Sequence, residues 1–323
     1  MLPIAFIIKN KLKRKARPGI SIIICAYNAE KRLEKTLRHL SSINIPEGID
    51  VELILVDNNS TDKTQELAQT IWNLLKHPFP LHIVEEPNPG LSNARRKGVL
   101  TAQYQYGIFC DDDNWLDENY LIHAKEVFET YPQVGVIGGC SVPVSEVELP
   151  AWFYTKCGSY AVGVQAYSDG DVTWRKFVWG AGMCFLVELL QSLYLNGVEH
   201  LTTDRKGSIL TSGGDGEISA WYIFLGYKLY YTSKLKLKHL MPADRLTDEY
   251  YHRFFGKHYP STWDSYSNFL TVRYLLGVKI ISKNLIQFFA IYMFSLFQII
   301  RHSRDANKVL VLHRKLRIIR RFI

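Results

Sequence analysis

The stretch Phe109-Cys110-Asp111-Asp112-Asp113-Asn114-Trp115 contains three consecutive acids, and it decides the fold of the chain. The three carboxylates directly follow an apolar segment, residues 106–110, which predicts a buried strand. Like charges this close repel one another, and none of them can be buried without a counter-charge. A divalent cation is the simplest remedy, because hard oxygen ligands suit Mg²⁺ or Mn²⁺. The alternative is a solvated acidic turn that leads into a helix cap.

Strand and helix patterns alternate on the N-terminal side of the acidic stretch. Apolar, β-branched runs predict strands at 20–27, 51–56, 81–84 and 108–109. Helices are expected from Asn28, as the N-cap, to about Leu40, from about 61–63 onward, and over 91–101. This order implies an α/β fold, with right-handed crossovers and a mostly parallel sheet flanked by helices.

Polar residues follow three of the predicted strands, at Tyr27-Asn28, at Asp57-Asn58 and at 111–113. Ligands of such sheets bind outside the carboxyl ends of the strands, so these side chains are expected to share one site. The chain has no GxGxxG after the first strand and no GxxxxGK[ST] anywhere. Their absence argues against a dinucleotide-binding oxidoreductase and against a P-loop NTPase.

The second half of the chain is less regular. A strand is expected at 134–144, an aromatic, loop-rich segment at 151–174, and a further strand and helix after 177–186. Residues 212–217 are expected to open a helix at 218–225, followed by a strand at 227–232 and by helices over 261–323.

Composition indicates a folded chain in a reducing compartment. Of the 323 residues, 47% are hydrophobic and 13% aromatic, which argues against disorder. The five cysteines form no CxxC pair. They are therefore interpreted as small buried hydrophobes and not as a disulfide framework or a zinc site.

Positive charge gathers at the two ends. The net charge is +8, but residues 1–17 and 301–323 together carry +13, which leaves −5 on residues 18–300. Basic ends of this kind suit an anionic membrane surface or a nucleic acid. The apolar run 285–300 has sixteen residues, short of the roughly 20 that a spanning helix needs. It predicts a helix lying in the membrane plane, or else a buried core helix.

Four separate motifs resemble those of the family 2 glycosyltransferases, of the bacterial type that builds surface polysaccharides. They are residues 21–28, 55–62, 90–98 and 111–113, in that order. The resemblance covers about residues 18–245. It implies a glycosyltransferase-A fold, a nucleotide-sugar donor, a divalent cation (Mn²⁺ or Mg²⁺) and, usually, inversion at the anomeric carbon.

The resemblance also assigns roles on the donor side. Tyr27 would pack on the nucleobase, and Asp57 would accept a hydrogen bond from uracil or ribose. Arg95 would lie near the diphosphate or the base. The full set of donor-side residues is Ala26, Tyr27, Asn28, Asp57, Asn58, Arg95, Asp111 and Asp112. Asn58 departs from the pattern, because many members carry a second acid there.

Metal binding is assigned by the resemblance to Asp113, with Asp111 as the ribose-side acid. Asp112 would orient its neighbours, and of the three acids it is the one expected to tolerate substitution best. His239 is a second metal-side candidate, although a purely structural histidine explains it equally well. Arg245 either reaches the diphosphate or is an ordinary surface charge.

The acceptor chemistry is placed in the second half. Residues 213–217 resemble the family's Gly-Glu-Asp-x-Glu segment, so Asp215 would be the base that takes the acceptor hydroxyl's proton. Gly214 stands where the family has Glu. Glu217 would orient an active-site group or cap the helix. The alternative for Asp215 is that it serves only as the N-cap of this helix. The segment Trp179, Gly180, Ala181 and Gly182 would line the acceptor side, or else form a tight turn in the core.

The expected enzyme moves a sugar from a nucleoside-diphosphate sugar, UDP favoured, to a hydroxyl of a glycan or lipid-linked glycan. Its parts would be a basic segment (1–17), a catalytic domain (18–260, divided into a donor half 18–130 and an acceptor half 131–260) and C-terminal helices (261–323). It would be cytoplasmic, held peripherally on the inner face of the membrane, with no nucleic acid as partner. A sugar nucleotidyltransferase needs a Gly-rich loop and a lysine, which residues 25–28 lack. A nucleic-acid-binding protein leaves Asp215 without a role.

Overall fold

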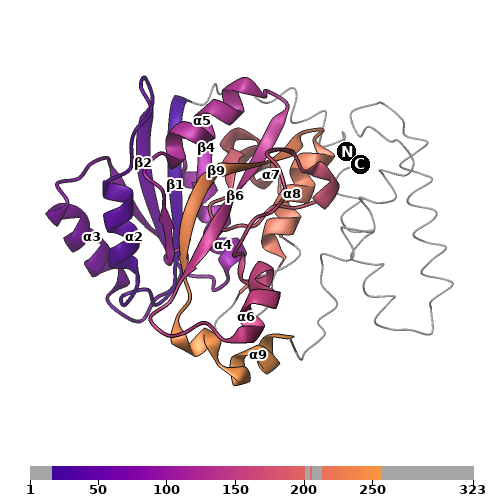
Figure 1. Ribbon diagram of the computed structural model, residues 1–323. Helices are drawn as coiled ribbons and strands as arrows, with labels where there is room; N and C mark the ends of the chain where they lie inside the picture. Colours follow the sequence, from indigo (N-terminus) through magenta and orange to yellow (C-terminus); the bar gives the residue numbers. More distant parts are fainter. Residues whose placement is uncertain (1–16, 201–203, 206–212, 256–323) are drawn as a thin grey trace, which may run out of the picture.

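The computed structural model describes residues 17–200, 204–205 and 213–255 (Figure 1). The expectations for residues 1–16, for the helices over 261–323 and for the apolar run 285–300 lie outside the described residues. The strands are β1 (Arg17–Ala26), β2 (Asp50–Asp57), β3 (Leu81–Glu85), β4 (Tyr104–Phe109), β5 (Asn114–Leu116), β6 (Val134–Val144), β7 (Gly170–Asp171), β8 (Cys184–Leu186) and β9 (Lys228–Leu240). The helices are α2 (Leu33–Ser41), α3 (Thr64–Leu74), α4 (Leu91–Thr101), α5 (Tyr120–Thr130), α6 (Ala151–Lys156), α7 (Val187–Leu195), α8 (Gly214–Phe224) and α9 (Asp248–Phe255).

All of these strands belong to one sheet, and the predicted α/β class is confirmed. The strand order is β3-β2-β1-β4-β8-β6-β9-β5, with β7 on β9. The first four strands in this order are parallel, as predicted. The remainder is mixed, because β8 runs antiparallel to β4 and β6 while β9 runs parallel to β6 and antiparallel to β5.

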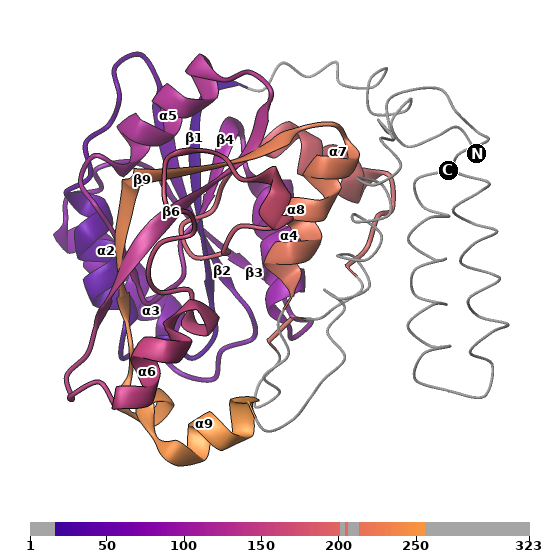
Figure 2. The ribbon, with the colours of Figure 1, turned by 45° about the vertical axis from the view of Figure 1, so that its right-hand side comes forward.

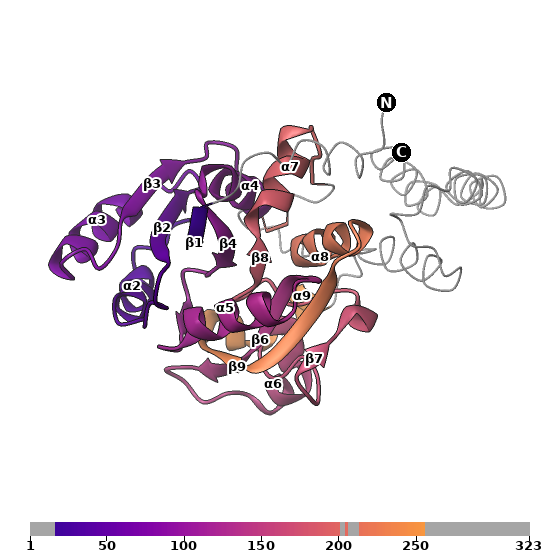
Figure 3. The ribbon, with the colours of Figure 1, turned by 90° about the horizontal axis from the view of Figure 1, so that it is seen from above.

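The alternation along β1 explains why the sheet is covered on both faces. Ile20, Ile22 and Ile24 enter the core that contains α2, α3 and α5 residues. Ile23 enters the core built with α4, α7 and α8. Successive side chains of a strand point to opposite faces, so a continuous isoleucine run serves two cores. Figure 3 shows α2 and α3 on one side of the strands and α4 and α7 on the other.

Asn28 does not cap the following helix. It adopts a left-handed backbone (φ 48°), and α2 begins only at Leu33, with no side-chain cap. Its backbone N–H donates to Ser60 Oγ at 3.0 Å, and its Oδ1 accepts from the Thr61 N–H at 2.8 Å. Asparagine tolerates this conformation and bonds readily to backbone groups, so here it joins the ends of β1 and β2.

Strand β9 is much longer than its sequence pattern predicts. Its pairing with β6 shifts between Gly138, opposite Tyr231, and Cys140, opposite Lys236. At the shift, a Cβ on Gly139 would overlap the carbonyl oxygen of Leu235. The absent side chain lets the bulged part of β9 approach β6 closely at this shift, beyond which β9 pairs with β5 as well.

A third, smaller core lies at one end of the molecule, where α6 and α9 meet (Figure 2). Its buried residues are Phe153, Tyr160, Val162, Met241, Leu246 and Tyr250. Tyr160 ends η1 (Cys157–Tyr160), and Leu246 ends η3 (Ala243–Leu246); a further short turn, η2, covers Thr173–Arg175. No helix in the described ranges is both long and apolar enough to cross a membrane.

The close approach of β9 at Gly139 yields a stability prediction. Gly139→Ala is expected to lower the free energy of unfolding by about 1–3 kcal/mol, because a backbone carbonyl cannot move aside for the methyl group. Urea unfolding followed by circular dichroism measures this change. Gly158→Ala is the matched control, since its new Cβ would lie 3.7 Å from the nearest atom, Trp179 Cζ2. Equal stability of the two variants would contradict the account of β9.

Candidate functional site

The predicted donor-side residues converge where β1, β2 and β4 end. Ala26 and Asp57 are partners in the β1–β2 register, and the Asn58 N–H donates to the Ala26 carbonyl at 2.8 Å. The Cys110 N–H donates to the Ile23 carbonyl at 3.0 Å, which brings the acidic stretch to the same edge. Parallel pairing therefore brings these strand ends together at one edge of the sheet, where ligands of such sheets bind.

Asp113 is buried between two basic side chains from β9 and the segment after it. Its Oδ1 lies 3.4 Å from His239 Nε2, and its Oδ2 lies 3.3 Å from Arg245 Nη1. Burial by itself would raise the pKa of Asp113, but His239, Arg245 and Arg32 hold that pKa well below its usual range. The carboxylate therefore stays ionised inside the protein.

His239 reaches Asp113 because β9 continues past Gly139 and pairs with β5, with His239 opposite Asn114. The Asn114 side-chain amide donates to Asp113 Oδ1 at 3.1 Å. His239 Nδ1 is buried and has no hydrogen-bond partner in the described part of the chain.

An ionised carboxylate facing an imidazole nitrogen suits Mn²⁺ or Mg²⁺. No cluster of three or more His, Cys, Asp or Glu side chains able to hold a metal occurs within 17–200, 204–205 and 213–255. A cation here would accordingly need further ligands from a bound phosphate and from water, which is how Mg²⁺ is commonly held. The residues present fit a cation that binds together with its substrate.

Asp112 has a partner that sequence reasoning missed. Arg32 binds its carboxylate with both Nε and Nη2, at 2.6 Å and 2.7 Å. The same guanidinium donates to the backbone carbonyls of Tyr27 and Asn28, at 3.0 Å and 2.8 Å. Burial raises the pKa of Asp112 to about 6, against the opposing effect of Arg32. Arg32 thus ties the acidic stretch to the turn after β1.

Two donor-side residues keep ligand-binding groups available, and one does not. The Tyr27 side chain is 45% exposed. Asp57 accepts a hydrogen bond from Gln65 on Oδ2 at 2.9 Å, while its Oδ1 has no partner among the described residues. Asn58 donates to the carbonyls of Glu86 and Asn88, and its Oδ1 accepts from the Gly90 N–H, each at 2.8 Å. Its amide is fully engaged in holding the loop before α4.

Arg95 lies buried in the middle of the site. Its guanidinium carbon sits 5.0 Å from the centre of the Phe109 ring, and Nη1 lies 3.5 Å from Asp204 Oδ2. A Cβ on Gly180 would come within 2.5 Å of Arg95 Nη2. Asp111 is also near enough to act on Arg95 electrostatically. Burial raises the pKa of Asp111, and Arg95 opposes that rise.

Asp215 lies in the first turn of α8, which begins four residues earlier than the expected start at 218. The Gly180 N–H donates to its Oδ2 at 3.2 Å, and the Gly216 N–H donates to its Oδ1 at 2.8 Å. The carboxylate is half-buried. Of the predicted acceptor segment, Gly180 is therefore the residue that contacts the predicted base.

The neighbours of Gly180 pack into the protein. Trp179 and Ala181 are buried, and the Trp179 N–H donates to Gln165 Oε1 at 2.8 Å. Gly182 has a left-handed backbone (φ 71°), and its carbonyl accepts from the Tyr120 hydroxyl at 2.7 Å. These contacts fix the path of the segment and so aim the Gly180 N–H at Asp215.

Glu217 lies on the inner side of α8 and is fully buried. Its Oε2 is 3.3 Å from His200 Nδ1, and His200 Nε2 is 2.8 Å from the Tyr194 hydroxyl. The geometry joins Glu217 to α7 and leaves Asp215 as the acid nearer the open side of the site.

With this geometry in place, comparison with known proteins identifies the domain. The model of the family described as Glycosyl transferase family 2 matches residues 21–174. These residues belong to glycosyltransferase family 2. The matched range includes the ends of β1, β2 and β4, whereas Asp215 and His239 lie beyond it.

Curated relatives of the family 2 domain include two poly-β-1,6-N-acetyl-D-glucosamine synthases. That of Staphylococcus epidermidis is 29% identical over 121 residues, and that of Staphylococcus aureus (strain COL) is 26% identical over 121 residues. Each match covers 38% of this chain and 28% of the relative. The matched region therefore spans just over a quarter of the length of these relatives.

Solved structures share the fold. TarS residues 1–349 from S. aureus, in complex with UDP-GlcNAc, has a TM-score of 0.53 at 16% identity, covering 69% of this chain and 58% of that one. The mannosyltransferase PcManGT from Pyrobaculum calidifontis, in complex with GDP-Man and Mn²⁺, has a TM-score of 0.51 at 20% identity, covering 75% and 65%. The glycosyltransferase-A fold of the family 2 domain is thereby confirmed.

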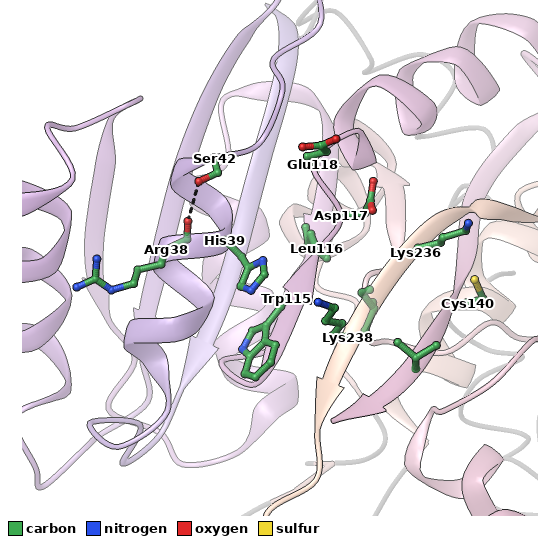
Figure 4. A pocket seen from close by; sticks show the side chains of 12 residues that line it. Arg38, His39, Ser42, Trp115, Leu116, Asp117, Glu118, Cys140, Lys236 and Lys238 are labelled. Atoms are coloured by element: carbon green, nitrogen blue, oxygen red, sulfur yellow. Dashed lines mark hydrogen bonds between the residues drawn. The ribbon is translucent and has the colours of Figure 1, made fainter. Parts of the chain in front are cut away.

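A separate pocket of about 750 Å³ lies between α2, β5 and β9 (Figure 4). His39 and Trp115 stack in it with ring centres 5.4 Å apart, and Lys236 and Lys238 line its far side. None of the predicted site residues lines this pocket. The candidate site is the edge at Asp113, and this pocket is distinct from it.

The Arg32–Asp112 pair predicts a stability effect inside the family 2 domain. Asp112→Ala is expected to lower the free energy of unfolding by about 1–3 kcal/mol, because it leaves Arg32 partly buried without its carboxylate. Urea unfolding measures the loss. The double variant Arg32→Ala/Asp112→Ala should lose less than the two single losses added together.

Glu118→Ala is the control for this measurement, since Glu118 is exposed and its carboxylate forms no ion pair in the described part of the chain. It is expected to change stability by no more than about 0.5 kcal/mol. Strictly additive losses in the Arg32–Asp112 cycle would show that the pair contributes nothing.

Proposed function

We propose that this chain is an inverting, metal-dependent glycosyltransferase that uses a nucleoside-diphosphate sugar, with UDP favoured. The acceptor would be a hydroxyl of a glycan or lipid-linked glycan in surface-polysaccharide synthesis. One observation carries the proposal: an ionised Asp113, a buried Arg95 and a half-buried Asp215 surround one edge of a family 2 domain. The named relatives and the TarS complex with UDP-GlcNAc support a UDP-sugar as the first donor to test.

The donor would lie across the ends of β1, β2 and β4. Tyr27 offers an exposed ring for the nucleobase, and Asp57 Oδ1 offers an unused acceptor for an N–H or a hydroxyl. Ala26 and Asn28 shape the turn that carries Tyr27, and Asp111 faces the ribose side. A buried oxygen without a hydrogen-bond partner is energetically costly. A nucleotide that donates a hydrogen bond to Asp57 Oδ1 would therefore bind more tightly.

Asp113 and His239 would hold Mn²⁺ or Mg²⁺ together with the donor diphosphate. When bound, such a cation stabilises the negative charge that grows on the leaving diphosphate. Arg245 lies beside Asp113 and adds positive charge on the same side. Arg95 contributes a second fixed cation deeper in the site.

Asp215 would take the proton from the acceptor hydroxyl. The Gly180 and Gly216 N–H groups hold its two carboxylate oxygens, which fixes the direction in which it accepts a proton. Inversion needs a base on the face opposite the leaving group, and general-base assistance contributes about 10²–10⁴-fold in rate.

A nucleotide-sugar assay tests these roles. In the presence of Mn²⁺ we expect the chain to bind one nucleotide sugar and to transfer its sugar to an acceptor, as measured by calorimetry and by nucleotide release. Asp113→Ala is expected to abolish the Mn²⁺-dependent part of donor binding. Asp215→Ala is expected to leave donor binding intact and to lower transfer by about 10²-fold or more.

Asp117→Ala is the control, because Asp117 is exposed and lines the separate pocket of Figure 4. It should behave as the unaltered protein in both assays. Transfer by Asp215→Ala at the native rate would disprove its assignment as the base, and donor binding independent of Asp113 would disprove the metal role.

We also propose that the enzyme works on the cytoplasmic face of the membrane, held there by residues 285–300 and by the basic ends. Those segments lie outside the described residues, so the sequence alone motivates this part. Removing residues 262–323 is expected to move the protein from the membrane fraction to the supernatant after centrifugation in low salt. A truncated chain that stays with the membranes would contradict peripheral anchoring through this segment.

A further inference from the structure

We propose that Asp204 is a positioning residue of the active site, one that supplies from outside α8 the carboxylate missing at Gly214 and holds Arg95 beside Asp215. This inference rests on the proposed function. It concerns a residue that the sequence patterns did not single out, ten positions before the glycine that it complements.

The volume above Gly214 is occupied by the Asp204 carboxylate. A Cβ built on Gly214 would lie 2.5 Å from Asp204 Oδ2 and 3.2 Å from its Cγ. Two atoms this close cannot coexist, so any side chain at position 214 would displace Asp204. Glycine at position 214 therefore leaves the space that the Asp204 carboxylate occupies. Only one of the two positions can place a carboxylate there, next to Asp215.

Asp204 points its carboxylate at Arg95. The two side chains are both more than nine-tenths buried, and Asp204 Oδ2 lies 3.5 Å from Arg95 Nη1. Burial raises the pKa of Asp204 to about 6, with Arg95 opposing that rise and Asp215 adding to it. Burial disfavours a charged guanidinium, and among the carboxylates that offset this for Arg95 the strongest is Asp204, ahead of Asp111 and Asp215.

The backbone around Asp204 joins the two helices that carry the chemistry. Asp204 has a left-handed φ of 54°, unusual for a residue other than glycine. The carbonyl of the next residue, Arg205, accepts from the Leu91 N–H at the start of α4, at 3.0 Å. The Asp204–Arg205 pair thus contacts α4 at its first amide and at Arg95, and contacts α8 at Gly214.

This arrangement predicts what the loss of Asp204 does. Of the described carboxylates that act on Arg95, Asp111 and Asp215 would then remain, and its guanidinium would shift toward the base. An ion pair formed directly with Asp215 lowers the basicity of that carboxylate, because a nearby cation favours its charged form. Turnover should fall, while the nucleotide part of the donor, which binds at Tyr27 and Asp57, should be held as before.

Carboxylate transplantation is the test. Asp204→Asn keeps the shape of the side chain and removes its charge, and it is expected to lower kcat for transfer by about 10- to 100-fold with little change in donor KM. Gly214→Glu alone should lose at least as much, because the new side chain meets Asp204. The double variant Asp204→Ala/Gly214→Glu returns one carboxylate to the same place and should recover most of the lost kcat relative to Gly214→Glu.

Asp169→Asn serves as the matched control, since Asp169 is a hydrogen-bonded carboxylate held by Thr232 and Ser233 and has no contact with Arg95. All variants are checked for cooperative unfolding. Native kcat in Asp204→Asn would overturn the proposal. So would a double variant that is no more active than Gly214→Glu while it unfolds cooperatively.

The outcomes separate this inference from the proposed function. Suppose that the unaltered protein and the Asp169→Asn control transfer sugar, while Asp204→Ala/Gly214→Glu recovers no kcat relative to Gly214→Glu. The glycosyltransferase assignment then stands, and the proposed role of Asp204 is wrong. If the unaltered protein transfers no sugar from any nucleotide sugar, the proposed function falls, and the positioning role that depends on it falls with it.

Discussion

The site depends on one electrostatic constraint: several carboxylates are buried at the same edge of a sheet, and each needs a positive partner. Asp112 is matched by Arg32, Asp204 by Arg95, and Asp113 by His239 and Arg245. A buried charge without a partner costs several kcal/mol, so the fold must bring these cations in from wherever the chain can supply them. This need restricts where α2, α4 and β9 can lie.

Each cation arrives on a different element. Arg32 immediately precedes α2, Arg95 lies on α4, and His239 lies near the end of β9. The register shift at Gly139 lets β9 stay paired with β6 up to Leu240, which places His239 beside Asp113. Apolar burial on both faces of β1 supplies most of the driving force, while the paired charges restrict which arrangement of these elements is acceptable.

The sequence patterns predicted the part of the fold that is governed by local rules. Continuous β-branched runs marked β1 and β2, and helix α4 matched its expected range, 91–101. Asp113 and His239 were predicted as a pair only through a family resemblance, and the structure places them 3.4 Å apart. The expected roles of the site residues remain predictions.

What local patterns missed has a common physical cause. Arg32 and its partner are 80 residues apart, and Arg95 and Asp204 are 109 apart, so no periodicity reveals either pair. Helix α5 and the C-terminal part of β9 were not predicted for a similar reason, because both depend on contacts with strands that are distant in sequence. The expected cap at Asn28 failed because its side chain bonds to Thr61 across the strand ends instead of to its own helix.

The clamp formed by Arg32 has a thermodynamic consequence for the proposed enzyme. One guanidinium holds both the carboxylate of Asp112, next to the metal-side Asp113, and the backbone carbonyl of Tyr27, on the nucleobase side. If cation binding shifts the acidic stretch, these contacts would pass the shift to the turn that carries Tyr27. Linkage then works in both directions: a cation that favours one position of the turn raises nucleotide affinity, and the nucleotide raises cation affinity by the same factor.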